Sequence, residues 1–79
     1  MEIKIFENIC WGGSKIAPIV DAVLTELKLD DDFEIIADIP SIAAAGVMEP
    51  PALMINGTVK LFGKIPTYED VKKVMEEEL

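Results

Sequence analysis

The most constraining feature of the chain is the pair Asn56-Gly57, which separates two runs rich in apolar and β-branched residues at 51–55 and 58–62. A two-residue hairpin turn of type I′ needs positive φ angles at both positions, and an Asn-Gly pair adopts them readily. Such a pair between two strand-like runs is among the strongest short-range signals for an antiparallel hairpin. The sequence therefore predicts two adjacent antiparallel strands within residues 51–62.

The first half of the chain alternates strand-like and helix-like patterns. Residues 2–6 alternate apolar and charged side chains, and 33–37 form a second apolar run, so we expect a strand at each. Between them, starting from Ser14, apolar residues recur at helical spacing as far as Leu27, before the acidic run 30–32 ends the pattern. Two strands joined by a helix of this length form a right-handed unit in which the strands are parallel.

Two further helices are expected on either side of the hairpin. Residues 38–46 suit a short helix, because Gly46 can adopt the left-handed conformation that ends one. After the hairpin, Thr67 is a suitable N-cap and Asp70 follows it by three residues. The resulting order β-α-β-α-β-β-α predicts an α/β fold in which a mixed four-stranded sheet carries helices on both faces.

Composition restricts the classes of function. The 79 residues suit one domain, which we expect to span 1–79, and a hydrophobic content of 51% supports a compact core. A net charge of −8 without any arginine argues against a surface for nucleic acid or for anionic membrane. Neither a signal-peptide pattern nor a run of membrane-spanning length is visible, so we expect a cytoplasmic protein.

Cys10 is the chain's single cysteine, and the chain has no histidine. One cysteine cannot form a disulfide within the chain, and a structural zinc site needs more Cys or His ligands than one chain offers. We therefore expect neither a metal centre nor another cofactor. Thiolates from two or more chains sharing a soft metal ion are an alternative that depends on oligomer formation. In a reducing compartment Cys10 is expected to be a free thiol.

Two motifs resemble the thioredoxin superfamily. The segment C-W-G-G-S-K-I-A-P-I-V-D (10–21) is similar to the thioredoxin active-site helix, in which a Cys-x-x-Cys pair precedes an Ile-Ala-Pro-Ile-Leu-Asp-like run. Residues 46–60 followed by 63–67 resemble small archaeal and bacterial thioredoxin-like proteins that are often called redox-active disulfide proteins. The resemblance covers nearly the whole chain and implies a thioredoxin-like fold.

The resemblance also implies roles for individual residues. Cys10 matches the family's nucleophilic cysteine, whereas Gly13 stands where the second, resolving cysteine would be. Pro18 matches the proline that kinks the active-site helix, and Pro51 matches the cis-proline that faces the reactive sulfur. The residue before that cis-proline offers its backbone N–H and C=O to an extended substrate, but Pro50 has no N–H to offer.

These residues suggest two functions. Thiol–disulfide exchange proceeds by thiolate attack to give a mixed disulfide, which a second thiol then resolves. Cys10 can perform the first step, and release then needs a protein thiol, a low-molecular-weight thiol, or a second copy of the chain linked through Cys10 as a homodimer. The alternative is a redox-inactive module that binds a protein partner through the surface of Cys10, Trp11 and Pro51. The expected substrate-binding residues are Trp11, Gly12, Gly13, Pro50 and Pro51.

The reactivity expected of Cys10 depends on its position at the start of a helix. A helix N-terminus favours an anion by roughly 0.3–1 kcal/mol, which lowers a thiol pKa of about 8.5 to about 8. Glu7 opposes ionisation of the thiol, and Lys15 favours it weakly. The sequence predicts a modest nucleophile, with a buried and inert cysteine as the alternative.

Overall fold

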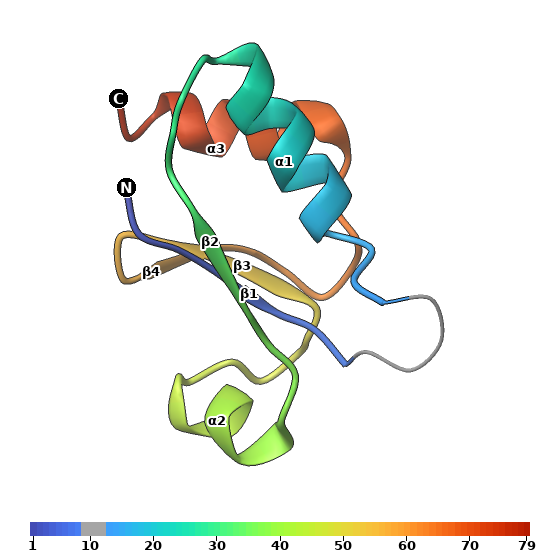
Figure 1. Ribbon diagram of the computed structural model, residues 1–79. Coiled ribbons are helices and arrows are strands. Elements are labelled where there is room, and N and C mark those ends of the chain that lie inside the picture. Colours follow the sequence, from blue (N-terminus) through green and yellow to red (C-terminus); the bar gives the residue numbers. More distant parts are fainter. Residues whose placement is uncertain (9–12) are drawn as a thin grey trace.

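The computed structural model describes residues 1–8 and 13–79 of the chain. Within them, strands and helices alternate in the order that the sequence predicts (Figure 1). The strands are β1 (Ile3–Phe6), β2 (Phe33–Ile36), β3 (Ala52–Ile55) and β4 (Thr58–Phe62). The helices are α1 (Ala17–Glu26), α2 (Ile39–Ala44) and α3 (Tyr68–Glu76).

The four strands form one mixed sheet in the order β2-β1-β3-β4. β1 and β2 run parallel, with Ile3 opposite Phe33, as expected for two strands joined by a helix. β3 is antiparallel both to β1, where Ile3 lies opposite Ile55, and to β4. Helices α1 and α3 lie together over one face of the sheet, and α2 lies on the other (Figure 1). The predicted α/β fold with helices on both faces is therefore confirmed.

Two clusters of buried side chains follow from this arrangement. The larger lies between the sheet and helices α1 and α3, where Ile5, Leu53 and Val71 are fully buried. The smaller lies on the α2 side and contains Phe6 and Ala52. Neighbouring residues along β1 serve opposite faces because side chains alternate along a strand. Across residues 1–8 and 13–79, no helix combines the length and apolarity needed to cross a membrane.

Local turn and cap chemistry explains why the elements end where they do. Asn56 and Gly57 have φ angles of 52° and 83°, as the predicted two-residue hairpin turn requires. Gly46, two residues beyond α2, is also left-handed, with φ 83°. At α3 the Asp70 N–H donates to Thr67 Oγ1 at 3.1 Å, and the Thr67 N–H donates to Asp70 Oδ2 at 3.2 Å. This reciprocal pair is the capping box.

Helix α1 differs from its prediction at the N-terminal end. The helix begins at Ala17, three residues after Ser14, so Pro18 lies in its first turn. The backbone N–H groups in the first turn of a helix have no hydrogen-bond partner within the helix. Proline has no N–H group, so Pro18 fits in the first turn without distorting the helix. The expectation that Pro18 kinks this helix is therefore wrong. Helix α2 is likewise shorter than 38–46, because Asp38 is its N-cap and accepts from the Ser41 N–H at 3.0 Å.

Candidate functional site

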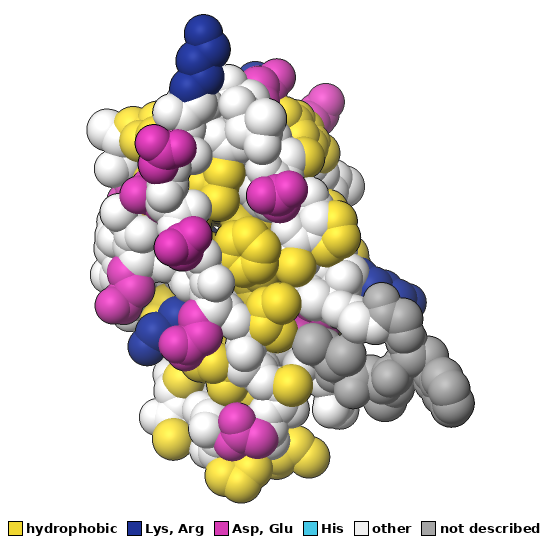
Figure 2. Space-filling view, viewed as in Figure 1, with side chains coloured by type: hydrophobic (Ala, Val, Ile, Leu, Met, Phe, Trp, Pro, Cys, Tyr) yellow, Lys and Arg dark blue, Asp and Glu magenta, His cyan; other side chains and the backbone are white. Residues whose placement is uncertain are grey.

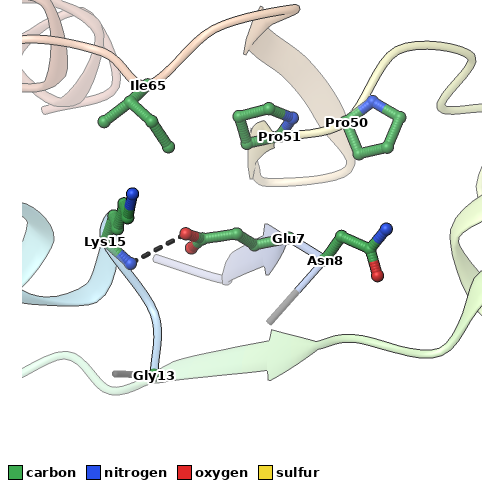
Figure 3. A pocket seen from close by; sticks show the side chains of 7 residues that line it. All are labelled: Glu7, Asn8, Gly13, Lys15, Pro50, Pro51 and Ile65. Carbon is green, nitrogen blue, oxygen red and sulfur yellow. Dashed lines mark hydrogen bonds between the residues drawn. The ribbon is translucent and has the colours of Figure 1, made fainter. Parts of the chain in front are cut away.

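The candidate site is a hollow of about 360 Å³ at the end of β1, where the start of α1 meets the loops before β3 and after β4. Figure 3 shows the side chains around it, with the Glu7 carboxylate directed toward Lys15 and with Pro50 and Pro51 across from it. The described residues that line it are Glu7, Asn8, Gly13, Lys15, Pro50, Pro51 and Ile65.

Glu7 follows β1 and is the buried acidic residue of this site, with 5% of its surface exposed. Its backbone N–H donates to the Ile36 carbonyl at 3.1 Å, which continues the β1–β2 ladder. Its carboxylate accepts from Ser14 Oγ at 2.6 Å and from the Lys15 N–H at 2.7 Å. The Ile16 N–H donates to the same carboxylate at a longer distance of 3.3 Å. A buried carboxylate with three donors has the hydrogen bonds that its burial requires.

These bonds make Glu7 a cap that reaches α1 from outside the helix. The N-cap residue Ile16 has no side chain able to accept a hydrogen bond, so the unpaired N–H groups before the helix need another acceptor. The Glu7 carboxylate is this acceptor for two of these groups, the N–H groups of Lys15 and Ile16. Ser14 extends the arrangement, because its Oγ donates to Glu7 and accepts from the Ala17 N–H at 3.0 Å. The strand end and the helix start are thereby tied together across residues 8–13.

The opposite wall of the hollow is the proline pair. The Pro50–Pro51 peptide bond is cis, and Pro50 is exposed whereas Pro51 is half-buried. The Gly63 N–H donates to the Pro51 carbonyl at 3.0 Å and to the Glu49 carbonyl at 2.9 Å. These two bonds fix the loop before β3 to the chain that leaves β4. They leave the two proline rings facing the hollow (Figure 3).

Three of the predicted site residues lie together, and three lie outside the described residues. Gly13, Pro50 and Pro51 line one hollow although they are far apart in the sequence. Gly13 is exposed, with φ 76°, and a Cβ atom at this position would meet none of the described residues within 4 Å. The predicted nucleophile and its two neighbours, Cys10, Trp11 and Gly12, belong to the undescribed segment.

Sequence reasoning missed several residues of this site. The sequence predicts that Glu7 influences the Cys10 thiol, but it does not predict that Glu7 caps α1. It gives no reason to place Asn8 and Ile65 at the site. Capping patterns are sought within three residues of a helix start, whereas the donors to Glu7 are seven to nine residues away. A charged residue directly after a buried strand was the available signal, because a buried carboxylate requires partners.

An apolar surface adjoins the hollow on its α2 side. Met48 is 90% exposed and Ile39 is 68% exposed, and both line a second hollow of about 290 Å³ that shares Asn8 and Pro50 with the first. Figure 2 shows hydrophobic side chains gathered over the α2 end of the molecule. Pro50 therefore lies between the hollow that contains Glu7 and Lys15 and the second hollow, whose lining is mostly apolar.

The chemistry available at the site follows from its lining. Among the described residues that line it, the charged side chains are Glu7, whose carboxylate is already occupied by donors, and Lys15. None of these described lining residues carries a thiol, a hydroxyl or an imidazole. Within the described part of the sequence, no group of three or more Cys, His, Asp or Glu residues is arranged to hold a metal ion.

Shifted pKa values occur away from the hollow, at the contact between α1 and α3. The Tyr68 hydroxyl donates to Glu26 at 2.5 Å, and Lys72 Nζ lies 3.0 Å from the same carboxylate. The Tyr68 bond, followed by the Lys72 bond, lowers the pKa of Glu26 below its ordinary value. The same carboxylate raises the pKa of both Tyr68 and Lys72. These groups connect the two helices and do not line the candidate site.

Comparisons with known proteins agree with this architecture. A family model described as a thioredoxin domain matches residues 1–76. The chain is also similar to a curated protein named thioredoxin from Methanothermobacter thermautotrophicus, with 28% identity over 75 residues. That alignment covers 95% of this chain and 97% of the archaeal protein, so the likeness extends over both chains almost completely.

Proposed function

Because the chain belongs to the thioredoxin domain family, we propose that it performs thiol–disulfide exchange through an intermolecular mixed disulfide at Cys10. One observation carries the proposal. Asn8 and Gly13 flank the segment that contains Cys10, and both line the hollow bordered by the Pro50–Pro51 pair. The chain therefore enters and leaves the cysteine segment at the wall of that hollow, and the resemblance assigns the reactive sulfur to the same place.

The proposed reaction has two steps. The Cys10 thiolate attacks one sulfur of a disulfide, a new S–S bond forms as the old one breaks, and the departing thiolate takes a proton from solvent. A second thiol then attacks the mixed disulfide, forms its own S–S bond and releases Cys10 as a thiolate. Gly13 provides no sulfur, so this second thiol comes from another molecule. Its source is a protein thiol, a low-molecular-weight thiol or Cys10 of a second chain.

Substrate contacts are proposed for the residues around the cysteine. The proposed contact residues are Trp11, Gly12, Gly13, Pro50 and Pro51. Pro50 can offer a carbonyl but no N–H, so an extended peptide makes one backbone hydrogen bond fewer there than at a residue with a free N–H. The apolar rings and the neighbouring Met48 surface favour recognition by apolar contact instead.

Formation of a mixed disulfide with oxidised glutathione tests the proposal. The folded protein is incubated with it at pH 8, and intact-mass spectrometry follows the adduct, with Cys10→Ser as the control. We expect one glutathione per chain in the wild type, none in C10S, and recovery of the free thiol on addition of reduced glutathione. A folded wild-type chain that forms no adduct over hours would contradict the proposal.

The exposed Met48 and Ile39 side chains favour a second candidate, a redox-inactive module that binds a protein partner. Apolar side chains at such a surface are typical of binding sites, where they bury area on association. For a partner bound under reducing conditions, this candidate predicts that C10S keeps the Kd of the wild type and that Met48→Asp weakens binding at least tenfold. Loss of binding in C10S would exclude it.

A further inference from the structure

We propose that the outer edge of β2 is a docking site for an extended, basic segment of a partner protein, which adds a strand to the sheet there. In the described part of the chain this edge has no pairing strand, and it combines outward-facing backbone groups, an exposed isoleucine and a run of carboxylates. The proposal goes beyond the proposed function, because none of the described residues that line the candidate site belongs to β2.

The two edge strands of the sheet, β2 and β4, differ in how they are protected. β4 carries Lys60, which has no partner on β3 because the pairing register shifts by one residue there. A lysine and a bulge are devices that keep an edge strand from pairing with another chain. β2 instead pairs with β1 in unbroken register and contains no lysine, proline or bulge. The edge of β2 is therefore able to accept a further strand.

The hydrogen bonding of β2 shows which backbone groups this edge offers. The Ile36 carbonyl accepts from the Glu7 N–H at 3.1 Å, so the N–H and C=O of Ile36 face β1. Successive residues of a strand direct these groups to opposite sides, so those of Glu34 also face β1, whereas those of Phe33 and Ile35 face outward. Two N–H donors and two C=O acceptors are therefore placed for an incoming strand.

The side chains of β2 define the sequence pattern that such a strand needs. Ile35 is 40% exposed and lies opposite Ile5, so it belongs to the face covered by α1 and α3. Glu34 is exposed and lies opposite Lys4, so it belongs to the other face. A neighbouring strand places its side chains against these two in alternation. The fitting strand therefore alternates an apolar residue, which covers Ile35, with a lysine or arginine, which pairs with Glu34.

The charge around β2 favours a basic partner over a second copy of the chain. Residues 30–38 contain no lysine or arginine and five acidic residues, Asp30, Asp31, Asp32, Glu34 and Asp38. At the start of the strand, a hollow of about 260 Å³ has Lys4 as the one cation among its described lining residues, against three carboxylates. Two such edges paired with each other would place like charges side by side, which destabilises a sheet.

The figures show the same edge from outside. β2 is the strand nearest the viewer in Figure 1, between the helix pair α1 and α3 on one side and α2 on the other. Figure 2 is viewed from the same direction and shows apolar side chains in the middle of this face, with acidic side chains beside them. An apolar strip bordered by carboxylates matches a strand that is apolar on one face and basic on the other.

The probe is a capped heptapeptide of alternating lysine and valine, titrated into the ¹⁵N-labelled, reduced protein at about 20 mM salt, where screening is weak. We expect the amide signals of Phe33 and Ile35 to shift and their hydrogen exchange to slow, because their N–H groups gain acceptors. The amides of Glu34 and Ile36, which already face β1, should change less. Raising the salt to about 0.5 M should weaken binding by about fivefold or more, since screening reduces the ion pairing.

Two control peptides separate the sequence pattern from the charge. A glutamate–valine heptapeptide should not bind. A peptide with the same lysines and valines in two blocks cannot alternate between Ile35 and Glu34, so it should bind about fivefold more weakly or less well still. Equal binding of the block peptide, or shifts confined to residues outside β2, would overturn the proposal.

Glu34→Gln tests the ion pair, and Glu77→Gln is its matched control. Each replaces one exposed carboxylate and makes the net charge of −8 less negative by one. Glu77 lies at the end of α3 beside Glu78, which pairs with Lys60 of β4 at the opposite edge of the sheet. E34Q should weaken binding by about two- to fivefold, and E77Q by less than about 1.5-fold. Equal effects of the two substitutions would contradict the proposal.

Ile35→Pro tests strand addition itself. It removes an N–H that faces away from β1, so the β1–β2 ladder keeps its hydrogen bonds while the edge loses a donor. A folded I35P variant should bind the lysine–valine peptide about fivefold more weakly or less well still, and an unchanged Kd would refute strand addition. If I35P does not fold, the amide pattern of the wild type decides. Shifts of Phe33 and Ile35 with protein concentration alone, together with a dimer in sedimentation, would assign the edge to a second copy and overturn the proposal.

Discussion

Restoring the missing sulfur at Gly13 tests the interpretation of the site most directly. Gly13→Cys would recreate a Cys-x-x-Cys spacing with Cys10, and Gly13→Ala would impose the same backbone change without a thiol. A Cβ atom at this position meets nothing within 4 Å among residues 1–8 and 13–79, so no collision with them opposes either substitution. The difference between the two variants therefore isolates the chemistry of the added sulfur.

The cost of both substitutions comes from the backbone. Gly13 has φ 76°, in the left-handed region where an L-residue is less stable than glycine by about 1–2 kcal/mol. Replacing glycine also reduces the conformational freedom of the unfolded chain, which stabilises the folded state by about 0.4–1 kcal/mol. The net loss in the free energy of unfolding is therefore about 1 kcal/mol. For a chain of 79 residues, this corresponds to a fall in Tm of roughly 4–8 °C.

Calorimetry and intact-mass spectrometry give the two readouts. G13A and reduced G13C should show similar falls in Tm, and oxidised G13C should lose two hydrogens as an internal disulfide forms. In a single turnover without added thiol, reduced G13C should release the reduced peptide and become internally oxidised, whereas the wild type and G13A should accumulate the mixed disulfide. A G13A variant as stable as the wild type would refute the backbone argument. An oxidised G13C that yields intermolecular dimers instead would refute the assignment of Gly13 as the resolving position.

The remaining predictions concern the helix caps. Thr67→Ala removes the hydroxyl that accepts from the Asp70 N–H and should cost about 1 kcal/mol of unfolding free energy in urea titrations. The backbone N–H of Thr67, followed by its hydroxyl, lowers the pKa of Asp70 in the folded chain. Its stabilising effect is therefore present above the unfolded pKa near 3.8 and is lost as the pH falls through the lower folded value. Asp70→Asn should flatten this acid dependence of Tm, and an equally steep acid limb would contradict the assignment.

The parts of the fold that sequence predicted well are those specified by short-range chemistry. The turn at Asn56-Gly57 requires nothing beyond the φ preferences of two residues, and the cap at Thr67 requires one partner three positions later. The parallel pairing of β1 and β2 follows from the length of the connection between them. Each of these features could be predicted because its cause lies within the segment itself.

The features that sequence reasoning missed depend on contacts between distant segments. Helix α1 begins later than its apolar pattern suggests because the Lys15 and Ile16 N–H groups are bonded to Glu7, not to a local cap. Nothing at the helix start indicates an acceptor seven to nine residues upstream. The meeting of Gly13 with the proline pair was predicted, but through a family resemblance, since no local pattern joins residue 13 to residue 51.

The unequal covering of the sheet has a consequence for how the molecule opens. Two helices of ten and nine residues protect one face, whereas the six-residue α2 covers the other above a buried cluster of Phe6, Ile42, Val47 and Ala52. The amide hydrogens of α2 should therefore exchange with solvent deuterium through a partial opening that requires less free energy than global unfolding. The amide hydrogens of β1 and β3 should exchange only when the whole chain unfolds. Ala52 adjoins Pro51, so this opening would loosen one wall of the candidate site while the opposite wall, held by Glu7, stays in place.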